Sequence, residues 1–117
     1  GKLAEIISKV KASMKISKNL GYMEVLDSGA SGAANFVLGF SGKDVAITYK
    51  ERVDKGIYAV SVRGSPSCKT HLGKLVSSIA SKLGGSGGGH DKACGAVIPK
   101  DKIKQFVSQM NSHLSSR

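Results

Sequence analysis

Apolar residues recur at helical spacing near the amino terminus. Between residue 3 and about residue 16 they are three or four positions apart, with lysines between them. This pattern predicts an amphipathic helix that the segment Asn-Leu-Gly at 19–21 ends. The apolar run at 22–26 then predicts a buried strand.

The next segment, residues 27–42, combines small residues with an apolar run at 36–40. Asp27, Ser28 and Ser31 are each able to cap the start of a helix. An exposed loop is the alternative, but Phe36 and Phe40 make this segment too apolar for one. We therefore expect a helix that approaches its neighbours closely.

Two runs rich in β-branched and aromatic residues follow at 45–52 and 57–63. The short connection between them contains Gly56, which suits a turn that needs a positive φ. These features predict a β-hairpin. The 3-1-3-1-3 spacing of apolar residues from Leu72 to Leu83 predicts a further amphipathic helix.

A glycine cluster follows that helix, since five of the six residues at 84–89 are glycine. The run at 93–99 predicts a strand, and apolar spacing after Pro99 predicts a last helix. The expected order is thus α, β, α, β, β, α, glycine loop, β, α. This order predicts a single α/β domain with a mixed β-sheet and helices packed on it.

The length and net charge of the chain limit which classes of function are compatible with the sequence. The 117 residues are enough for one domain, and no apolar run reaches the roughly 20 residues of a membrane span. Eighteen Lys and Arg against eight Asp and Glu give a net charge of +10. This excess favours a polyanionic partner, although solubility alone is the alternative.

The two cysteines, Cys68 and Cys94, lack the spacing of a zinc site or a disulfide framework. They are expected to be reduced thiols in a cytoplasmic protein. Secretion is not expected either, because the given sequence has no charged start followed by an apolar signal core. The chain begins with Gly1, which suggests an excised domain or a cleaved tag. His71 and His113 are expected to be structural or exposed.

Ordering a glycine cluster on folding costs conformational entropy, so the cluster at 84–89 calls for a structural or functional explanation. A flexible, disordered linker is disfavoured because a helix and a strand flank the glycines closely. We therefore expect an ordered loop. Neither the phosphate loop GxxxxGK[ST] nor the Rossmann turn is present, because here the glycines follow a helix and lead to a strand.

The segment GGGHDKACG, residues 87–95, resembles the GGGH motif of the DHH-associated domain. That domain is the C-terminal substrate-binding module of DHH-family phosphoesterases, such as RecJ-like exonucleases, nanoRNases and cyclic dinucleotide phosphodiesterases. The family's Ser-x-Arg signature is matched by Ser61, Val62 and Arg63. The extra glycines and serine at 84–86 and the segment after Arg63 depart from the pattern, which leaves the path of the loop open.

The resemblance implies a module for residues 1–117 that grips the phosphate and terminal nucleotide of a short or single-stranded nucleic acid, oligonucleotide or nucleotide. It implies Arg63, Gly87, Gly88, Gly89 and His90 as the substrate-binding residues. Glycine amides come close to a phosphate, and an arginine places two N–H groups on one. Without the resemblance, a lone histidine after a glycine turn is more often a surface residue.

In that family, catalysis belongs to a separate N-terminal DHH domain, which holds two metal ions, usually manganese. This chain has no DHH triplet and no clustered carboxylates and histidines, so we expect it to bind without cleaving and to hold no cofactor or metal itself. Residues 1–20 are a candidate connector to that domain, and no membrane partner is expected.

Two other functions stay open. A divergent relative of the domain occurs in alanyl-tRNA synthetases, which makes a tRNA-binding or interaction module the main alternative. A KH-like RNA module fits less well, because its GxxG loop joins two helices.

Overall fold

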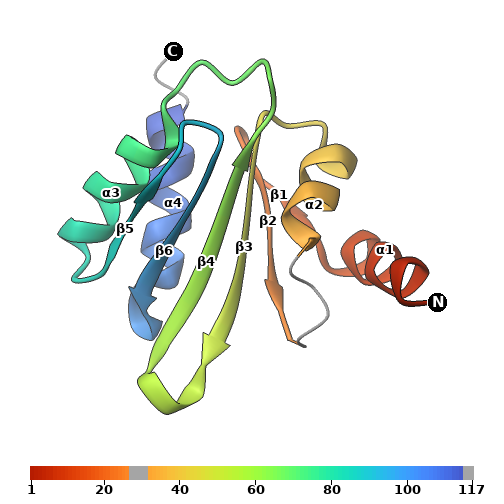
Figure 1. The fold of residues 1–117 in the computed structure, drawn as a ribbon, viewed down its shortest axis with the longest axis horizontal. Helices are drawn as coiled ribbons and strands as arrows, with labels where there is room; N and C mark the ends of the chain where they lie inside the picture. The colour runs from red at the N-terminus through yellow and green to blue at the C-terminus, as the bar shows by residue number, and fades with distance from the viewer. Residues whose placement is uncertain (27–31, 115–117) are drawn as a thin grey trace.

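The computed structural model describes residues 1–26 and 32–114. These residues form one sheet flanked by helices (Figure 1). The helices are α1 (Lys2–Ser13), α2 (Ala33–Ser41), α3 (Leu72–Lys82) and α4 (Ile103–Leu114), with short 3₁₀ helices η2 (Val53–Lys55) and η3 (Lys100–Lys102). The strands are β1 (Lys15–Ile16), β2 (Gly21–Val25), β3 (Val45–Arg52), β4 (Ile57–Gly64), β5 (Ser86–Gly89) and β6 (Ala93–Pro99).

The six strands lie in the order β1-β2-β3-β4-β6-β5. The pair β2 and β3 is parallel, and the other neighbours are antiparallel. The predicted mixed sheet with packed helices is therefore confirmed. The sheet has two strands more than the sequence predicted, β1 and β5, and each lies at one of its edges.

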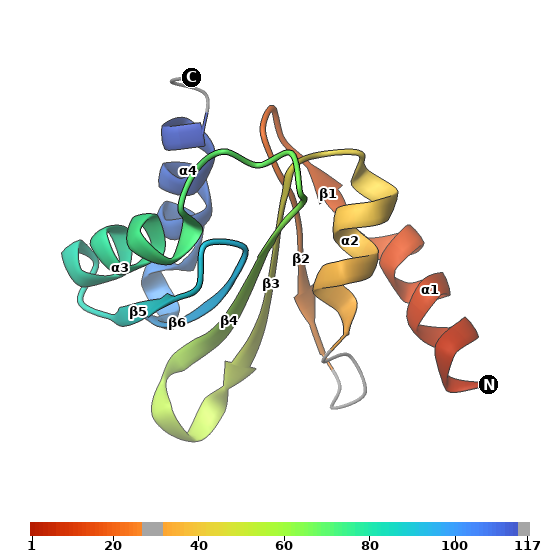
Figure 2. The same ribbon diagram turned by 45° about the horizontal axis from the view of Figure 1, so that its top comes forward.

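Helices pack on both faces of the sheet. Val45 and Ile47 of β3 join the larger core cluster with residues of α3 and α4. Ala46, on the other face of the same strand, joins a smaller cluster with α1 and α2 residues such as Val10 and Val37. Figure 2 shows these two helix pairs on opposite sides of the sheet. In Figure 1, β4 and β6 face the viewer with no helix in front of them.

The first helix is shorter than predicted. It ends at Ser13, and residues 15 and 16 pair with β2 in an antiparallel bridge. The side chain of Asn111 in α4 holds the turn that follows: its Oδ1 accepts hydrogen bonds from the Ser17 hydroxyl and the Asn19 amide, both at 2.9 Å. The prediction was wrong because this partner lies more than 90 residues away in the sequence.

The helix predicted after residue 27 is confirmed as α2, which begins after Gly32 with no side-chain cap. The candidate caps Asp27, Ser28 and Ser31 lie outside the described residues. The hairpin of β3 and β4 is confirmed, and Gly56 in its connection has a φ of +65°. The predicted helix, strand and last helix after the hairpin are confirmed as α3, β6 and α4.

The glycine cluster is ordered, but it is not the loop that was predicted. Gly84 ends α3 with a φ of +84°, while its amide bonds to Ser81 and that of Gly85 to Ala80. This pair of bonds is the Schellman arrangement, which favours glycine after a helix. Residues 86–89 then continue as β5, the edge strand that pairs with β6. The turn itself is confined to the residues after Gly89.

Candidate functional site

The open face of β4 and β6 carries small residues. Along both strands buried residues alternate with more exposed ones, as expected where one face is covered and the other is not. The register places three pairs of residues side by side on the open face: Ala59 with Val97, Ser61 with Gly95, and Arg63 with Ala93. Apart from Arg63, these side chains are short, so a ligand can lie close to the sheet.

Arg63 and His90 flank Ala93 on this face. Arg63 pairs with Ala93 across β4 and β6. The amide of His90 donates to the carbonyl of Ala93 at 3.0 Å, which continues the β5–β6 register by one residue. Cross-strand partners point to the same face of a sheet. Two residues that are 27 positions apart in the sequence therefore form one row.

The guanidinium of Arg63 is oriented by main-chain contacts. Its Nη1 donates to the carbonyl oxygens of Val62 at 2.9 Å and Cys94 at 3.4 Å. An arginine has five N–H donors, so several remain for an anion. Among the described residues, no carboxylate lies within ion-pair distance of Arg63, and no side-chain hydrogen bond of His90 is formed.

The glycines of β5 fit tightly against the helix and the strand on either side. Gly88 and Gly89 have φ values of +148° and +137°, which favour glycine. A Cβ at Gly73, in the first turn of α3, would lie 2.1 Å from the carbonyl oxygen of Gly89. A Cβ at Gly87 would lie 2.7 Å from that of Gly95. These contacts explain why glycine is needed on both sides of the interface.

The start of α3 is bonded to the turn after β5. The amides of Leu72 and Gly73 donate to the carbonyls of Asp91 and His90, at 2.9 and 3.1 Å. The amide of Lys74 donates to Nδ1 of His71, at 3.1 Å. The first-turn amides of α3 are thus occupied within the protein, and they are not available to an anion.

Lys92 also serves the structure of this turn. Its Nζ donates to the carbonyl of Cys68 at 2.6 Å, which ties the turn to the segment before α3. His71 caps α3 and His113 contacts the carbonyl of Gln109, in line with the expectation that both are structural or exposed.

A shallow, open groove of about 580 Å³, here the α3–β5 groove, lies between α3 and the edge strand β5. It is lined by His71, Gly73, Lys74, Ser77, Ser78, Gly88 and Gly89. The three α3 side chains at 74, 77 and 78 are not part of the site that the sequence predicted. Their spacing on the helix face opposite the apolar residues was the available signal.

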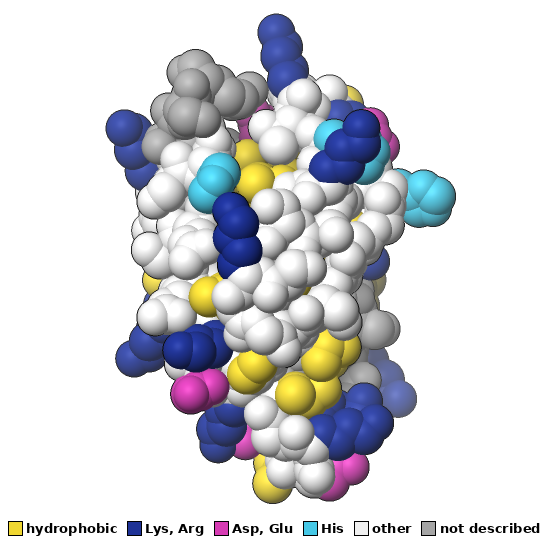
Figure 3. Space-filling view, turned by 90° about the vertical axis from the view of Figure 1, so that its left-hand side faces the viewer, with side chains coloured by type: hydrophobic (Ala, Val, Ile, Leu, Met, Phe, Trp, Pro, Cys, Tyr) yellow, Lys and Arg dark blue, Asp and Glu magenta, His cyan; other side chains and the backbone are white. Residues whose placement is uncertain are grey.

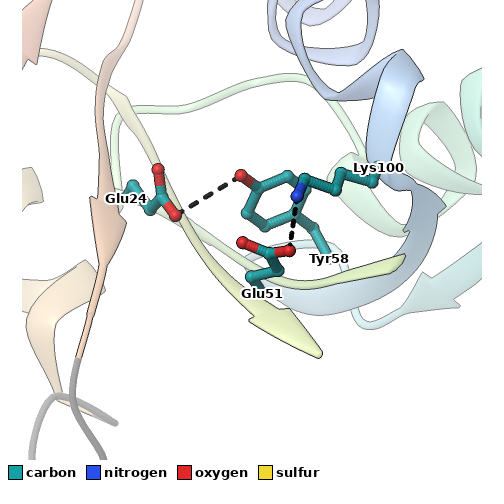
Figure 4. Close-up of polar contacts among 4 residues, drawn as sticks. All are labelled: Glu24, Glu51, Tyr58 and Lys100. Carbon is teal, nitrogen blue, oxygen red and sulfur yellow. Dashed lines mark hydrogen bonds and ion pairs between the residues drawn. The ribbon is translucent and has the colours of Figure 1, made fainter. Parts of the chain in front are cut away.

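A second polar cluster lies between β2, β3 and β4, at the other end of the sheet (Figure 4). The hydroxyl of Tyr58 donates to Glu24 at 3.4 Å, and Lys100 forms an ion pair with Glu51 at 2.6 Å. Burial raises the pKa of Tyr58, and the charge of Glu24 adds to this effect. Each of the two carboxylates therefore has its own partner.

Within the described residues, no group of three or more His, Cys, Asp or Glu side chains is placed to hold a metal ion. Both cysteines are free and buried, as expected for reduced thiols. Burial raises the pKa of Cys94 to about 11, although the charge of Arg63 acts in the opposite direction. No helix in the described part of the chain is long and apolar enough to cross a membrane.

Several solved structures share this fold. A pGpG-specific phosphodiesterase, PggH from Vibrio cholerae, superposes with a TM-score of 0.73 at 15% identity, over 98% of this chain and 39% of that protein. RecJ from Thermus thermophilus, in complex with Mg²⁺, superposes with a TM-score of 0.66 at 15% identity, over 99% of this chain and 18% of that protein. The C-Ala domain of alanyl-tRNA synthetase from Aquifex aeolicus superposes with a TM-score of 0.69 at 15% identity, over 89% of this chain and 99% of that domain.

A curated relative, the uncharacterized protein MJ0988 of Methanocaldococcus jannaschii, is 43% identical over 65 residues, which are 54% of this chain. The chain spans only 20% of that protein's length. A model of the DHHA1 domain family matches residues 17–116, a range that contains Arg63 and His90. This match confirms the resemblance drawn from residues 87–95. The chain therefore belongs to the DHHA1 domain family.

Proposed function

We propose that this chain is the substrate-binding module of a DHH-type phosphoesterase. In this proposal it grips the phosphate and terminal nucleotide of a short or single-stranded nucleic acid, while a DHH domain outside residues 1–117 cleaves it. The substrate-binding residues are Arg63 and His90, together with the main chain of the glycines at 87–89.

The row of Arg63, Ala93 and His90 is the observation that carries the proposal. Arg63 offers a rigid fork of donors for phosphate oxygens, and His90 offers a further donor or a ring that stacks on a base. Ala93 between them leaves room for the ligand. The glycines of β5 bring main-chain amides to the sheet edge without side chains in the way.

Family membership supports a proposed arrangement of the whole protein. RecJ is described in complex with Mg²⁺, and we propose that a divalent ion such as manganese or magnesium serves the DHH domain. Residues 1–20 would connect that domain to this one. The two free, buried thiols agree with a cytoplasmic location.

Replacing His90 by alanine tests the proposal. Binding of a 5′-phosphorylated hexaadenylate, measured by amide chemical shifts, should weaken about ten-fold or more, the size expected for losing one hydrogen bond to a charged group. The free energy of unfolding should change by less than about 0.5 kcal/mol, because His90 is exposed. His113→Ala, the same change at an exposed position of α4, is the control and should bind normally. Unchanged binding, or a large loss of stability, in His90→Ala would contradict the assignment.

A tRNA-binding or interaction module is the second candidate. The observation in its favour is the C-Ala domain, which this chain covers almost completely, whereas it covers a minor part of the two phosphoesterase-like structures. Competition between a tRNA and the phosphorylated hexaadenylate separates the two functions. Tight tRNA binding that His90→Ala leaves intact would favour this second candidate.

A further inference from the structure

The α3–β5 groove is a feature that the row of Arg63 and His90 does not use. Among its lining residues, four bear polar side chains, His71, Lys74, Ser77 and Ser78, and none is acidic. Figure 3 faces this side of the molecule, and in its upper half histidine and Lys or Arg side chains are visible together with a few Asp or Glu side chains. The groove is shallow and open to solvent, which suits contact with part of an extended ligand and not enclosure of a small one.

Hydrogen bonds within the protein fix one donor of the groove. The Nδ1 atom of His71 accepts the amide of Lys74 at 3.1 Å, so the proton of the neutral imidazole is on Nε2. Nε2 therefore acts as a donor. The ammonium of Lys74 adds a full positive charge, and within the described part of the chain it forms no ion pair.

The donors of the groove are side chains and not helix amides. The first-turn amides of α3 are all bonded inside the protein, to residues 71, 90 and 91. An anion in the groove would be held by Lys74, by the hydroxyls of Ser77 and Ser78, and by Nε2 of His71. Positively charged and neutral donors without a carboxylate favour an anionic ligand, and a phosphate accepts several hydrogen bonds at once.

The groove and the row meet at one peptide. Gly89 lines the groove, and the next residue, His90, belongs to the row. Between them passes the edge strand, whose glycines carry no side chains. A ligand with successive phosphates on a flexible backbone is able to follow this edge, as single-stranded nucleic acids follow basic grooves.

We propose that the α3–β5 groove holds a second phosphate of a single-stranded oligonucleotide whose terminal phosphate lies at Arg63 and His90. This inference rests on the proposed function, and it adds His71, Lys74, Ser77 and Ser78 to the substrate-binding surface. The groove then selects for ligands longer than one nucleotide.

The test compares adenosine 5′-monophosphate with 5′-phosphorylated hexaadenylate, both titrated into the full chain by NMR. Lys74→Ala should weaken binding of the hexanucleotide about five-fold and change binding of the mononucleotide by less than about two-fold. Loss of one phosphate contact should also reduce the slope of log K against log salt by about 0.7 for the hexanucleotide. Ser77→Glu, which places a carboxylate in the groove, should act in the same direction. Lys55→Ala, the same charge change in η2, is the matched control and should alter neither ligand.

The outcomes separate the two proposals. Binding of the hexanucleotide that is unchanged in both Lys74→Ala and Ser77→Glu would overturn the groove and leave the row intact. Equal weakening of both ligands in Lys74→Ala would also overturn it, since the groove would then not be a separate subsite. If neither ligand binds to the unchanged chain, the proposed function is overturned, and the proposal for the groove with it.

Discussion

Arg63 and His90 stand on either side of Ala93, in one row across the open face of the sheet. Their α-carbons are therefore two strand spacings apart, about 10 Å. Both side chains are long enough to reach a phosphate over Ala93. In the proposed function, Arg63 contributes a planar pair of donors that a lysine ammonium does not provide.

Replacing Arg63 by lysine tests that fork. The charge is kept, but the paired donors and the bonds to the carbonyls of Val62 and Cys94 are lost. We expect binding of phosphorylated hexaadenylate to weaken about ten-fold, and the free energy of unfolding to fall by about 1 kcal/mol. Calorimetry and urea titration measure the two effects. Arg52→Lys, at the exposed end of β3, should change neither; full affinity in Arg63→Lys would mean that only charge matters.

Gly73→Ala should strongly destabilise the domain. Its Cβ would lie 2.1 Å from the carbonyl oxygen of Gly89, and main chain on both sides leaves little room to shift. We expect a loss of about 3 kcal/mol in the free energy of unfolding. Gly39→Ala in α2 is the matched control: its Cβ meets nothing within 4 Å, so this change should stabilise by about 0.5 to 1 kcal/mol. Urea denaturation distinguishes them, and similar effects for both would refute the tight contact.

Gly88→Ala tests the effect of backbone conformation separately from that of steric contact. A Cβ there would meet its nearest atom, the carbonyl oxygen of Gly73, only at 3.8 Å, but its φ of +148° is one that other residues rarely adopt. We expect a loss of about 1 to 3 kcal/mol from backbone strain alone. Ser86→Ala in the same strand should stay within about 0.5 kcal/mol. A neutral Gly88→Ala would show that β5 does not need this conformation.

The stability of the domain should fall above pH 9 because of Cys94. Burial raises the pKa of its thiol from an ordinary 9.0 to about 11 in the folded state. The protonated thiol therefore contributes stability in full below pH 9, and that contribution is lost as the pH rises from 9 to 11. Burial also raises the pKa values of Tyr49 and Tyr58, whose effects begin near pH 10.

Unfolding free energies of Cys94→Ala and the unchanged chain, measured between pH 8 and 10, isolate the thiol. The variant will be less stable overall, since a buried side chain is shortened, but its stability should fall less steeply with pH. Parallel curves would contradict the contribution of Cys94.

The elements that the sequence predicted well are those whose side chains alone determine the structure. The hairpin of β3 and β4 follows from β-branched residues and from Gly56, and α3 from its apolar spacing. The short strand β1 was missed because Lys15 and Ile16 continue the helical spacing of α1, whereas Asn111 holds the turn after them.

The strand β5 was missed for a different reason. Glycine is among the residues least favoured in strands, so no propensity predicts one at 86–89. Its structure comes from pairing with β6 and from packing against Gly73. Likewise, the motif suggested Arg63 and His90 one by one, but only the strand register places them together. Lys74 was not singled out, because a helix-surface lysine is usually just solvated.

An edge strand offers unpaired main-chain groups to any other chain that can add a strand. β5 is four residues long, and two of its three glycines have φ values outside those of an ordinary strand. Such a short, irregular edge is a poor template for a further β-strand. The glycine edge beside the candidate site is thus also expected to protect this domain from aggregation by sheet extension.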